Sequence, residues 1–577
     1  MALRRAALLG WIVSIVVVAL VAPAVALLPE RCGGVTEESL ERTANELAGW
    51  LIRNQRPDGS YLYLYDAEAD RIIDDYNIVR HAGVTLSLYQ AAAAGIDGAL
   101  EAADSGRDWA LDRRYEHDDW VAFHTVGDVS TGASALLVAA LVERREHTGD
   151  TRHDGVLAGM GRFLAESVEP RGSVIASFDD DTGEPVAGDY SPFFTGEVFW
   201  ALARLHTNFP DDGWDEAARP IGSYLARERD EEEGYWPDLP DHWAGYAFDE
   251  VLRWQEVDED AEPLTEDELA YVDRQARIFG TTARYESQRT GSALNELVRG
   301  GPTSASGLGA LGEGLTGIWR AAGRDDRLAP LEASVAERSA CVADRIHDRQ
   351  VTPEEAEEYP RPDLAEGAIF RLGTTQMDTQ QHSLSATLRT QAIVAAGDLD
   401  GGGAAPGSQP AAWLLLLAFL GAVNPARFVR RDPDRRRRST AAAITFAMAL
   451  AAAFLADPFL DGLDLSAPNL RIAAGVALLA LAARDLFFSD RTPLVADGRW
   501  GVLPALLRPE LVLLALSAGA DRGVLVTVLG AAVALGAAVA VPPVDLAPTW
   551  RTWLVRLVAV ALAVVAVELV IAGVYDV

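Results

Sequence analysis

Apolar residues at helical spacing recur through residues 36–396, and they define two alternating kinds of helix. Six segments carry small and apolar residues on most sides, and they begin near Ile78, Thr131, Phe193, His242, Ser306 and Gln381. Six others have one apolar and one polar face, and they cover 36–54, 97–113, 151–168, 214–229, 265–287 and 325–348. This alternation predicts a closed ring in which one helix layer is buried inside the other. The expected fold class is all-α, an (α/α)6 toroid.

The loops of this ring are unequal in length. Links that follow a buried-type helix are often short, such as AAGI and HTGD, whereas the links that lead into one are long. Two long links, SYLYLYDAEADRIID and GSVIASFDDDTGEPVAG, alternate apolar and polar residues around turn residues, which predicts small β-hairpin insertions. The long loops and the N-termini of the buried helices therefore share one face, where a binding site is expected.

Apolar runs flank the toroid on both sides. Residues 1–29 predict a signal anchor, or a signal peptide that is cleaved, because two arginines precede a long apolar run. Residues 30–398 form the toroid domain, residues 399–410 a Gly/Ala/Pro linker, and residues 411–577 a transmembrane domain of about six helices. The six candidate spans are 411–424, 440–460, 470–488, 500–518, 522–541 and 552–574.

The charge pattern sets the expected topology. Seven arginines between Arg427 and Arg438 separate the first two spans, and the positive-inside rule places them in the cytoplasm. Residues 31–400 are then extracytoplasmic, in a multi-pass cell-membrane protein whose first partner is the lipid bilayer. The chain of 577 residues has a net charge of −35, most of it in the toroid, so nucleic acid is excluded as a partner. Cys32 and Cys341 allow one disulfide or two free thiols, and neither a metal nor a cofactor is predicted.

Polar residues gather where the buried helices begin. In DYNIVRHAG, Arg80 and His81 suggest an anion clamp beside an acid–base imidazole, whereas a helix cap and an ion pair are the structural alternative. In PDLPDHWAGYAFDE, the aromatic residues suit the apolar faces of sugar rings. The catalytic candidates are Asp75, His81, Glu197, Asp241, His242, Tyr246 and Asp378. The substrate-binding candidates are Tyr76, Asn77, Arg80, Tyr190, Trp243, Gln381 and His382. Asp128 and Glu313 are lesser candidates, more typical of capping or pairing.

Two family resemblances follow from these motifs. With DYNIVRHAG, DYSPFFTGE and PDHWAGYAFDE, residues 36–396 resemble the six-hairpin glycosidase-like toroids, which include uronate lyases, unsaturated glucuronyl hydrolases and glucuronyl epimerases. With LGAVNPARFVRR, LSAPNLRIAAGVALLALAARDLF and GVLPALLRPELVLLALSAG, residues 411–577 resemble MarC/LysE-type integral membrane proteins, which are thought to be transporters.

The function expected from these observations is carbohydrate metabolism at the cell envelope. The resemblance implies a membrane-tethered, extracytoplasmic enzyme that acts on an acidic glycan or cell-envelope polymer by general acid–base chemistry. The residues do not choose between a glycoside hydrolase, a polysaccharide lyase and an epimerase. The alternative is a membrane transport or envelope-assembly protein whose toroid binds a ligand without catalysis.

Overall fold

The computed structural model describes residues 32–397, apart from 74, 126, 236–237, 259, 290–304 and 372. It also describes 399, 412–424, 435–456, 458, 467–488, 509–540 and 548–575. The predicted N-terminal anchor and most of the predicted linker lie outside these residues. The chain divides into two compact units, Arg31–Ala405 and Met1–Glu30 with Pro406–Val577, and each is described by itself.

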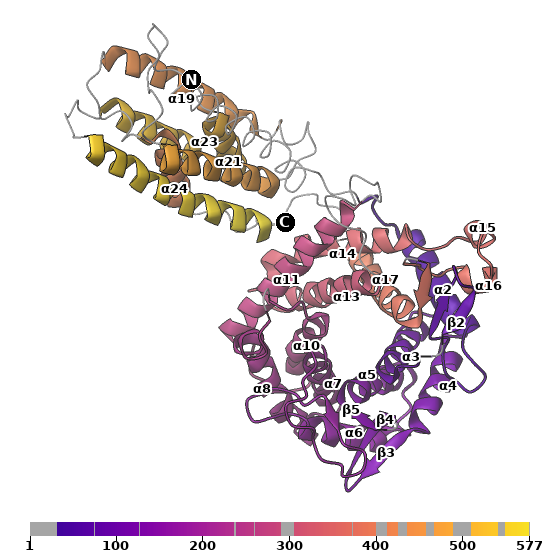
Figure 1. The fold of residues 1–577 in the computed structure, drawn as a ribbon. Coiled ribbons are helices and arrows are strands. Elements are labelled where there is room, and N and C mark those ends of the chain that lie inside the picture. The colour runs from indigo at the N-terminus through magenta and orange to yellow at the C-terminus, as the bar shows by residue number, and fades with distance from the viewer. Residues whose placement is uncertain are drawn as a thin grey trace. The chain divides into compact units, whose positions relative to one another are not determined.

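Six helices close a ring in the first unit (Figure 1). They are α3 (Ile78–Ala93), α5 (Thr131–Thr148), α7 (Phe194–Asn208), α10 (His242–Arg253), α13 (Ala305–Ala322) and α17 (Met377–Ala396). Each packs against the next in this order, and α17 packs against α3. Six outer helices pack on this ring: α2 (Glu37–Arg53), α4 (Ala99–Leu111), α6 (Asp154–Glu166), α8 (Trp214–Arg227), α11 (Glu266–Ser287) and α14 (Glu332–His347). The predicted (α/α)6 toroid is therefore confirmed.

Residue size explains which helices lie inside. In α5 every residue from Thr131 to Val142 is buried, and most of them are small or aliphatic. In α8 the buried residues fall on one face, so the other face meets solvent. The side chains of Asn77, Ser130 and Asp241 accept hydrogen bonds from backbone N–H groups at the starts of α3, α5 and α10. These caps satisfy backbone donors that a helix leaves free at its first turn.

Two small antiparallel sheets lie in the long loops. One has the strand order β2–β1–β7 and the other β3–β4–β5–β6. The strands are β1 (Leu64–Asp66), β2 (Arg71–Ile73), β3 (Arg114–His117), β4 (Trp120–Thr125), β5 (Asp128–Ser130), β6 (Ser177–Phe178) and β7 (Thr374–Gln376). The hairpin predicted before α3 is the β1–β2 pair, and β7 joins it from the loop before α17. The hairpin predicted in GSVIASFDDDTGEPVAG is reduced to β6 and a bridge between Phe178 and Pro185.

Short helices complete the first unit. They are α9 (Arg229–Glu232), α15 (Pro353–Ala356), α16 (Pro362–Ala365) and three 3-10 turns at Pro210–Asp212, Trp254–Glu256 and Ala329–Leu331.

A disulfide fastens the seam of the ring. Cys32, just before α2, is bonded to Cys341 in α14, with the two Cα atoms 5.1 Å apart. Beside it, the Gly33 N–H donates to Asp344 Oδ2 at 2.7 Å. The single disulfide is thus the arrangement found, rather than two free thiols.

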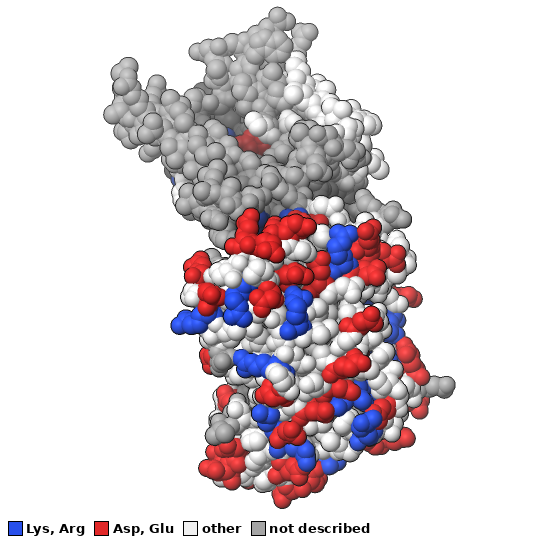
Figure 2. All heavy atoms as spheres, turned by 90° about the vertical axis from the view of Figure 1, so that its right-hand side faces the viewer, with Lys and Arg blue, Asp and Glu red and all other residues white. Residues whose placement is uncertain are grey.

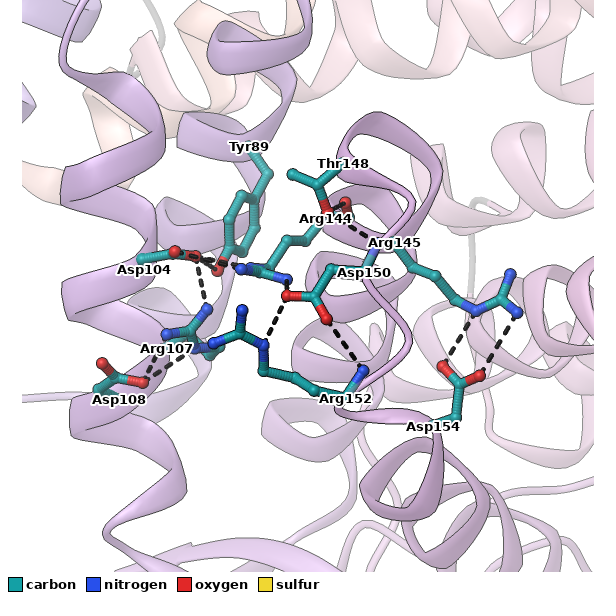
Figure 3. A network of polar contacts seen from close by, with 10 residues as sticks. All are labelled: Tyr89, Asp104, Arg107, Asp108, Arg144, Arg145, Thr148, Asp150, Arg152 and Asp154. Atoms are coloured by element: carbon teal, nitrogen blue, oxygen red, sulfur yellow. Dashed lines mark hydrogen bonds and ion pairs between the residues drawn. The ribbon is translucent and has the colours of Figure 1, made fainter.

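A network of charged side chains joins neighbouring helical hairpins near the C-terminal ends of the inner helices α3 and α5 (Figure 3). Asp104 of α4 accepts hydrogen bonds from Tyr89 Oη, Arg107 Nη1 and Arg144 Nε at 2.7, 2.6 and 2.7 Å. Arg144 also bonds Asp150 at 2.8 Å. Because every buried charge of this network has an opposite partner, it offsets much of its cost of desolvation.

The surface of the toroid carries the charge expected from its composition. Figure 2 shows acidic side chains spread over the visible face, with arginines between them. Interspersed charges of both signs are typical of a solvated surface. Acidic residues outnumber basic ones in the sequence, and all of the basic residues are arginine.

The second unit consists of apolar helices. They are α18 (Ala412–Val423), α19 (Arg435–Phe454), α21 (Ala467–Phe488), α23 (Pro509–Ala540) and α24 (Pro548–Tyr575). Gly523 has a φ of 76° and interrupts α23 at the start of the predicted span 522–541. Among the described residues, one helix, Gly523–Ala540, is long and apolar enough to cross a membrane, and three apolar helices are shorter. The six-span arrangement therefore stays a prediction.

One buried polar contact joins three helices of this unit. Asn424, which follows α18, donates from Nδ2 to Asp485 Oδ2 in α21 at 3.0 Å and to the Val555 carbonyl in α24 at 3.4 Å. Asn424 adopts a positive φ of 48°, so it ends α18 in the left-handed conformation that asparagine tolerates.

Candidate active site

A continuous chain of ion pairs runs from the surface into the centre of the ring. It links Arg80 to Asp378 at 3.6 Å, Asp378 to His382 at 3.6 Å, and His382 to Glu313 at 2.5 Å. The exposed fraction of these side chains falls along the chain from 34% to 17%, 13% and 1%. The cluster is therefore reached from the side of Arg80, at the end of the ring where the inner helices begin and the loops are long.

Two histidines contact one carboxylate at the buried end of this series of ion pairs. Glu313 Oε2 lies 2.5 Å from His382 Nδ1 and 3.7 Å from His242 Nε2, and the imidazole centroids are 5.4 Å apart. His242, Glu313 and His382, here called the histidine cluster, come from α10, α13 and α17. His242 Nε2 is buried without a hydrogen-bond partner. The two imidazoles thus have different environments within one site.

The electrostatic surroundings shift the pKa values of the two histidines in opposite directions. Burial lowers the pKa of His242 well below its ordinary value, and the nearby His382 adds to this effect. Burial also opposes the charge of His382, but Glu313, Asp378 and Glu197 outweigh it and raise its pKa to about 9. At neutral pH one imidazole is therefore neutral and can accept a proton, while the other is charged and can donate one.

Glu197 of α7 faces the same interior. Its side chain is buried, and Oε2 has no hydrogen-bond partner. Burial, with Asp241 as the next cause, raises the pKa of Glu197 to about 8, so it keeps its proton at neutral pH. Gly132 of α5 makes room for it, because a Cβ there would lie 2.5 Å from Glu197 Oε2.

The structure gives Asp241 a different setting from Glu197. It caps α10 by accepting the Ala244 N–H at 3.1 Å, and it binds Arg229 Nη1 at 2.5 Å. Both carboxylate oxygens are therefore engaged within the protein, one in a helix cap and the other in an ion pair.

Aromatic rings pack beside the histidine cluster. Trp243 stacks on Trp200 at 5.5 Å between centroids and touches the His242 ring at 4.4 Å. Tyr246, one turn further along α10, is buried and packs against Trp200. Gln381 lies next to His382, with Nε2 3.4 Å from Nδ1. These residues hold the imidazoles in place.

The side chains of the motif DYNIVRHAG point to two different parts of the toroid. Arg80 reaches the site, and it also hydrogen-bonds the Tyr63 hydroxyl. His81 turns instead toward α4, where Nδ1 contacts Tyr76 Oη at 2.7 Å and Nε2 the Gly106 carbonyl at 2.8 Å. Burial lowers the pKa of His81 to about 3, and both ring nitrogens are occupied. His81 and Tyr76 therefore lie apart from the histidine cluster.

Three other candidates occupy the rim. Asn77 caps α3 by accepting the Arg80 N–H at 3.1 Å. Asp75 is exposed, and Tyr190 is exposed and donates to Glu169 Oε2 at 2.9 Å. The side chain of Asp128 lies outside the described residues.

Glu313 lies at the centre of the histidine cluster, although the sequence pattern made it only a lesser candidate. It sits in LGEGL, an apolar and glycine-rich stretch where no neighbouring residue signals chemistry. A carboxylate in the middle of a mostly apolar and buried helix was the available signal, because such a group needs a partner.

The histidine cluster also has the donor set of a metal site. Its three ligand atoms lie within 4.8 Å of one another. Two imidazoles and one carboxylate suit zinc or iron(II). The hydrogen bond from His382 Nδ1 already occupies the Glu313 oxygen that a metal would need.

The fold and this site define an (α/α)6 toroid with a buried acid–base cluster at its centre. No protein family model matches the chain, and no curated protein sequence is similar to it. Solved structures with a partial likeness include a variant of the α-1,6-mannanase GH76A of Salegentibacter, at 12% identity and a TM-score of 0.41, covering 61% of this chain and 99% of that one. Cellobiose 2-epimerase from Spirochaeta thermophila matches at 16% identity and a TM-score of 0.43, covering 62% and 98%. The toroid assignment rests on the helix contacts above.

Proposed function

We propose that the toroid is a carbohydrate-active enzyme that moves a proton on a sugar by general acid–base catalysis. The observation that carries this proposal is the pair of unlike imidazoles on Glu313. His242 offers an unoccupied Nε2 as the base, and His382 is held by Glu313 and Asp378 as the acid. Proton transfer by two positioned groups of unequal pKa is the chemistry that such a pair performs.

The geometry favours a lyase or an epimerase over a hydrolase. Hydrolysis of a glycosidic bond needs a second carboxylate that is free to activate water or attack the sugar. Glu197 is protonated at neutral pH, and Asp241 is bound by Arg229 and the start of α10. The imidazoles are better placed to remove a proton from a carbon next to a carbonyl or carboxylate and to return one.

Arg80 supports an acidic glycan as the substrate. It is the outermost member of the ion-pair chain, and its guanidinium is one-third exposed. A substrate carboxylate that displaced Asp378 from Arg80 would gain a charge-assisted hydrogen bond and would bring its α-carbon toward the imidazoles.

We also propose that the toroid is extracytoplasmic and tethered to the membrane. The disulfide between Cys32 and Cys341 supports an oxidising compartment. The apolar helix Gly523–Ala540 and the predicted N-terminal anchor support the tether. A membrane-impermeant maleimide, applied to intact cells after mild reduction, should label Cys32, the more exposed of the two cysteines, and labelling only after lysis would contradict this location.

The activity is tested with the full-length chain in D2O. A panel of neutral and uronate-containing oligosaccharides would be followed by mass spectrometry, by ultraviolet absorbance of unsaturated uronates and by release of reducing ends. We expect deuterium at one carbon, or an unsaturated product, and on the order of 100-fold loss in His242→Gln and His382→Gln. His147→Gln, an exposed change at the end of α5, is the matched control. Reducing ends without either signal would identify a hydrolase, and saturable binding without turnover would favour the ligand-binding alternative.

A further inference from the structure

A second layer of side chains lies beneath the histidine cluster on the same three helices. Tyr246 follows the histidine of α10 by four residues, and Arg320 and Arg389 follow the cluster residues of α13 and α17 by seven. Four and seven residues keep a side chain on the same helix face, and seven advance it by about 10 Å. Both arginines therefore lie at one depth inside the ring, separated from the acid–base cluster by aromatic rings.

The guanidinium of Arg389 lies over the ring of Tyr246. The guanidinium carbon of Arg389 lies 3.9 Å from the Tyr246 ring centroid and 6.0 Å from that of Trp200. Arg389 Nε and Tyr246 Oη are both buried and lack a hydrogen-bond partner. Tyr246 is 2% exposed, so water does not replace the missing contact at its hydroxyl. Unsatisfied buried donors of this kind are uncommon in folded proteins and call for a partner.

Arg320 and Arg389 repel each other. Repulsion from Arg389 is the largest cause that lowers the pKa of Arg320, and burial adds to it. Neither arginine has an ion pair among the described residues. The acids that act on the charge of Arg320 are Asp249 and Glu143, and other arginines already bind them at 2.8 and 2.9 Å. Two positive charges are thus left facing the interior without an anion.

We infer that Arg320 and Arg389 form a binding site for a small oxyanion with two negative charges, of the phosphate or sulfate class. Each guanidinium group donates in a planar fork, which suits the oxygens of a tetrahedral oxyanion. The double charge neutralises both arginines at once. Both arginines are half-buried, so an ion can reach them from solvent. This site goes beyond the proposed acid–base function and does not depend on it.

The test is thermal unfolding of the full-length chain in detergent, with phosphate titrated against sodium chloride at matched ionic strength and pH. A chain with a net charge of −35 is stabilised by any salt through screening, so only the excess due to phosphate counts. We expect a saturable rise of the midpoint with phosphate beyond that with chloride. Equal shifts with both salts would overturn the proposal.

Variants identify the residues. Arg320→Gln and Arg389→Gln should each weaken the phosphate response by about tenfold or more, because each removes a charged donor. Without phosphate their midpoints should equal or exceed that of the parent chain, because one of two repelling charges is gone. Arg42→Gln, an exposed change on α2, should leave the response intact. Undiminished responses in the first two variants, or a collapse of their midpoints without phosphate, would contradict the site.

Discussion

Glu313 and His382, on neighbouring helices of the ring, share a hydrogen bond of 2.5 Å at a point where almost no solvent reaches them. The carboxylate keeps the imidazolium charged against the cost of burial, and the imidazolium keeps the carboxylate from being an isolated buried charge. Removing either member therefore changes the chemistry of the other.

The Glu313→Gln variant should change the pH dependence of turnover. The pKa of His382 is raised to about 9, so this residue stays charged until the pH rises through that value. Without Glu313 the pKa falls, and we expect the alkaline limb of kcat/KM to move to lower pH, with on the order of 100-fold loss at pH 8. Glu313→Asp should recover part of both effects. An unchanged alkaline limb would mean that His382 is not the group that titrates.

Glu197 should make stability depend on pH in a defined direction. Its pKa is about 8 in the folded protein against an ordinary value of 4.5, so between these values only the folded chain holds the proton. The contribution of Glu197 to stability is then greatest below pH 4.5, falls by up to about 1.4 kcal/mol per pH unit, and changes no further above pH 8. Glu197→Gln removes this penalty, so its unfolding midpoint should exceed that of the parent chain at pH 8 but not at pH 4. Equal differences at both values would contradict the assignment.

Gly132→Ala tests the space around Glu197. The added Cβ would lie 2.4 Å from the Phe194 ring and 2.5 Å from Glu197 Oε2, so at least one must move. We expect a loss of about 1–3 kcal/mol in unfolding free energy together with reduced turnover. Gly155→Ala in α6 is the matched control, because nothing lies within 4 Å of its Cβ and alanine favours a helix. Denaturant unfolding should show the control equal to or more stable than the parent chain.

Asp104→Asn should destabilise the toroid. It removes the carboxylate that Arg107 and Arg144 share, but each arginine keeps one other acid, so we expect a cost of about 1–3 kcal/mol. The neighbouring exposed Asp108 offers the comparison, since Asp108→Asn should cost less than about 1 kcal/mol. Chemical denaturation of the two variants side by side separates a buried network from a surface ion pair.

The ring could be predicted from the sequence because its inner helices differ from its outer ones in residue size. Five of the six inner helices begin within one residue of the predicted position. The exception is α17, which begins at Met377 rather than near Gln381, because its first turn, MDTQ, is mostly polar and does not show the apolar pattern. Helix starts follow from local caps and periodicity, which a sequence displays directly.

The site was less predictable because it depends on which way a side chain turns. His81 and His242 both lie near the start of an inner helix, yet His81 faces an outer helix and His242 the centre of the ring. Glu313 meets His242 and His382 on the two adjoining inner helices, which are far apart in sequence. Whether the six apolar runs form a membrane bundle stays a prediction, because the described helices include one that meets the length and hydropathy of a span.

The disulfide between Cys32 and Cys341 has a mechanical consequence. Where the first and last hairpins of the ring meet, it is closed by the packing of α2 and α14 on α17 and by the pairing of β1 with β7, and apolar segments of the sequence flank the toroid on both sides. If those segments are held in a lipid layer, tension on residue 32 passes through the covalent bond into α14 instead of peeling α2 from the ring. Force applied at the N-terminal end of the toroid would then be carried by a covalent bond. Reduction of that bond would leave α2 held by non-covalent contacts alone, so the toroid would open from α2 at a lower force.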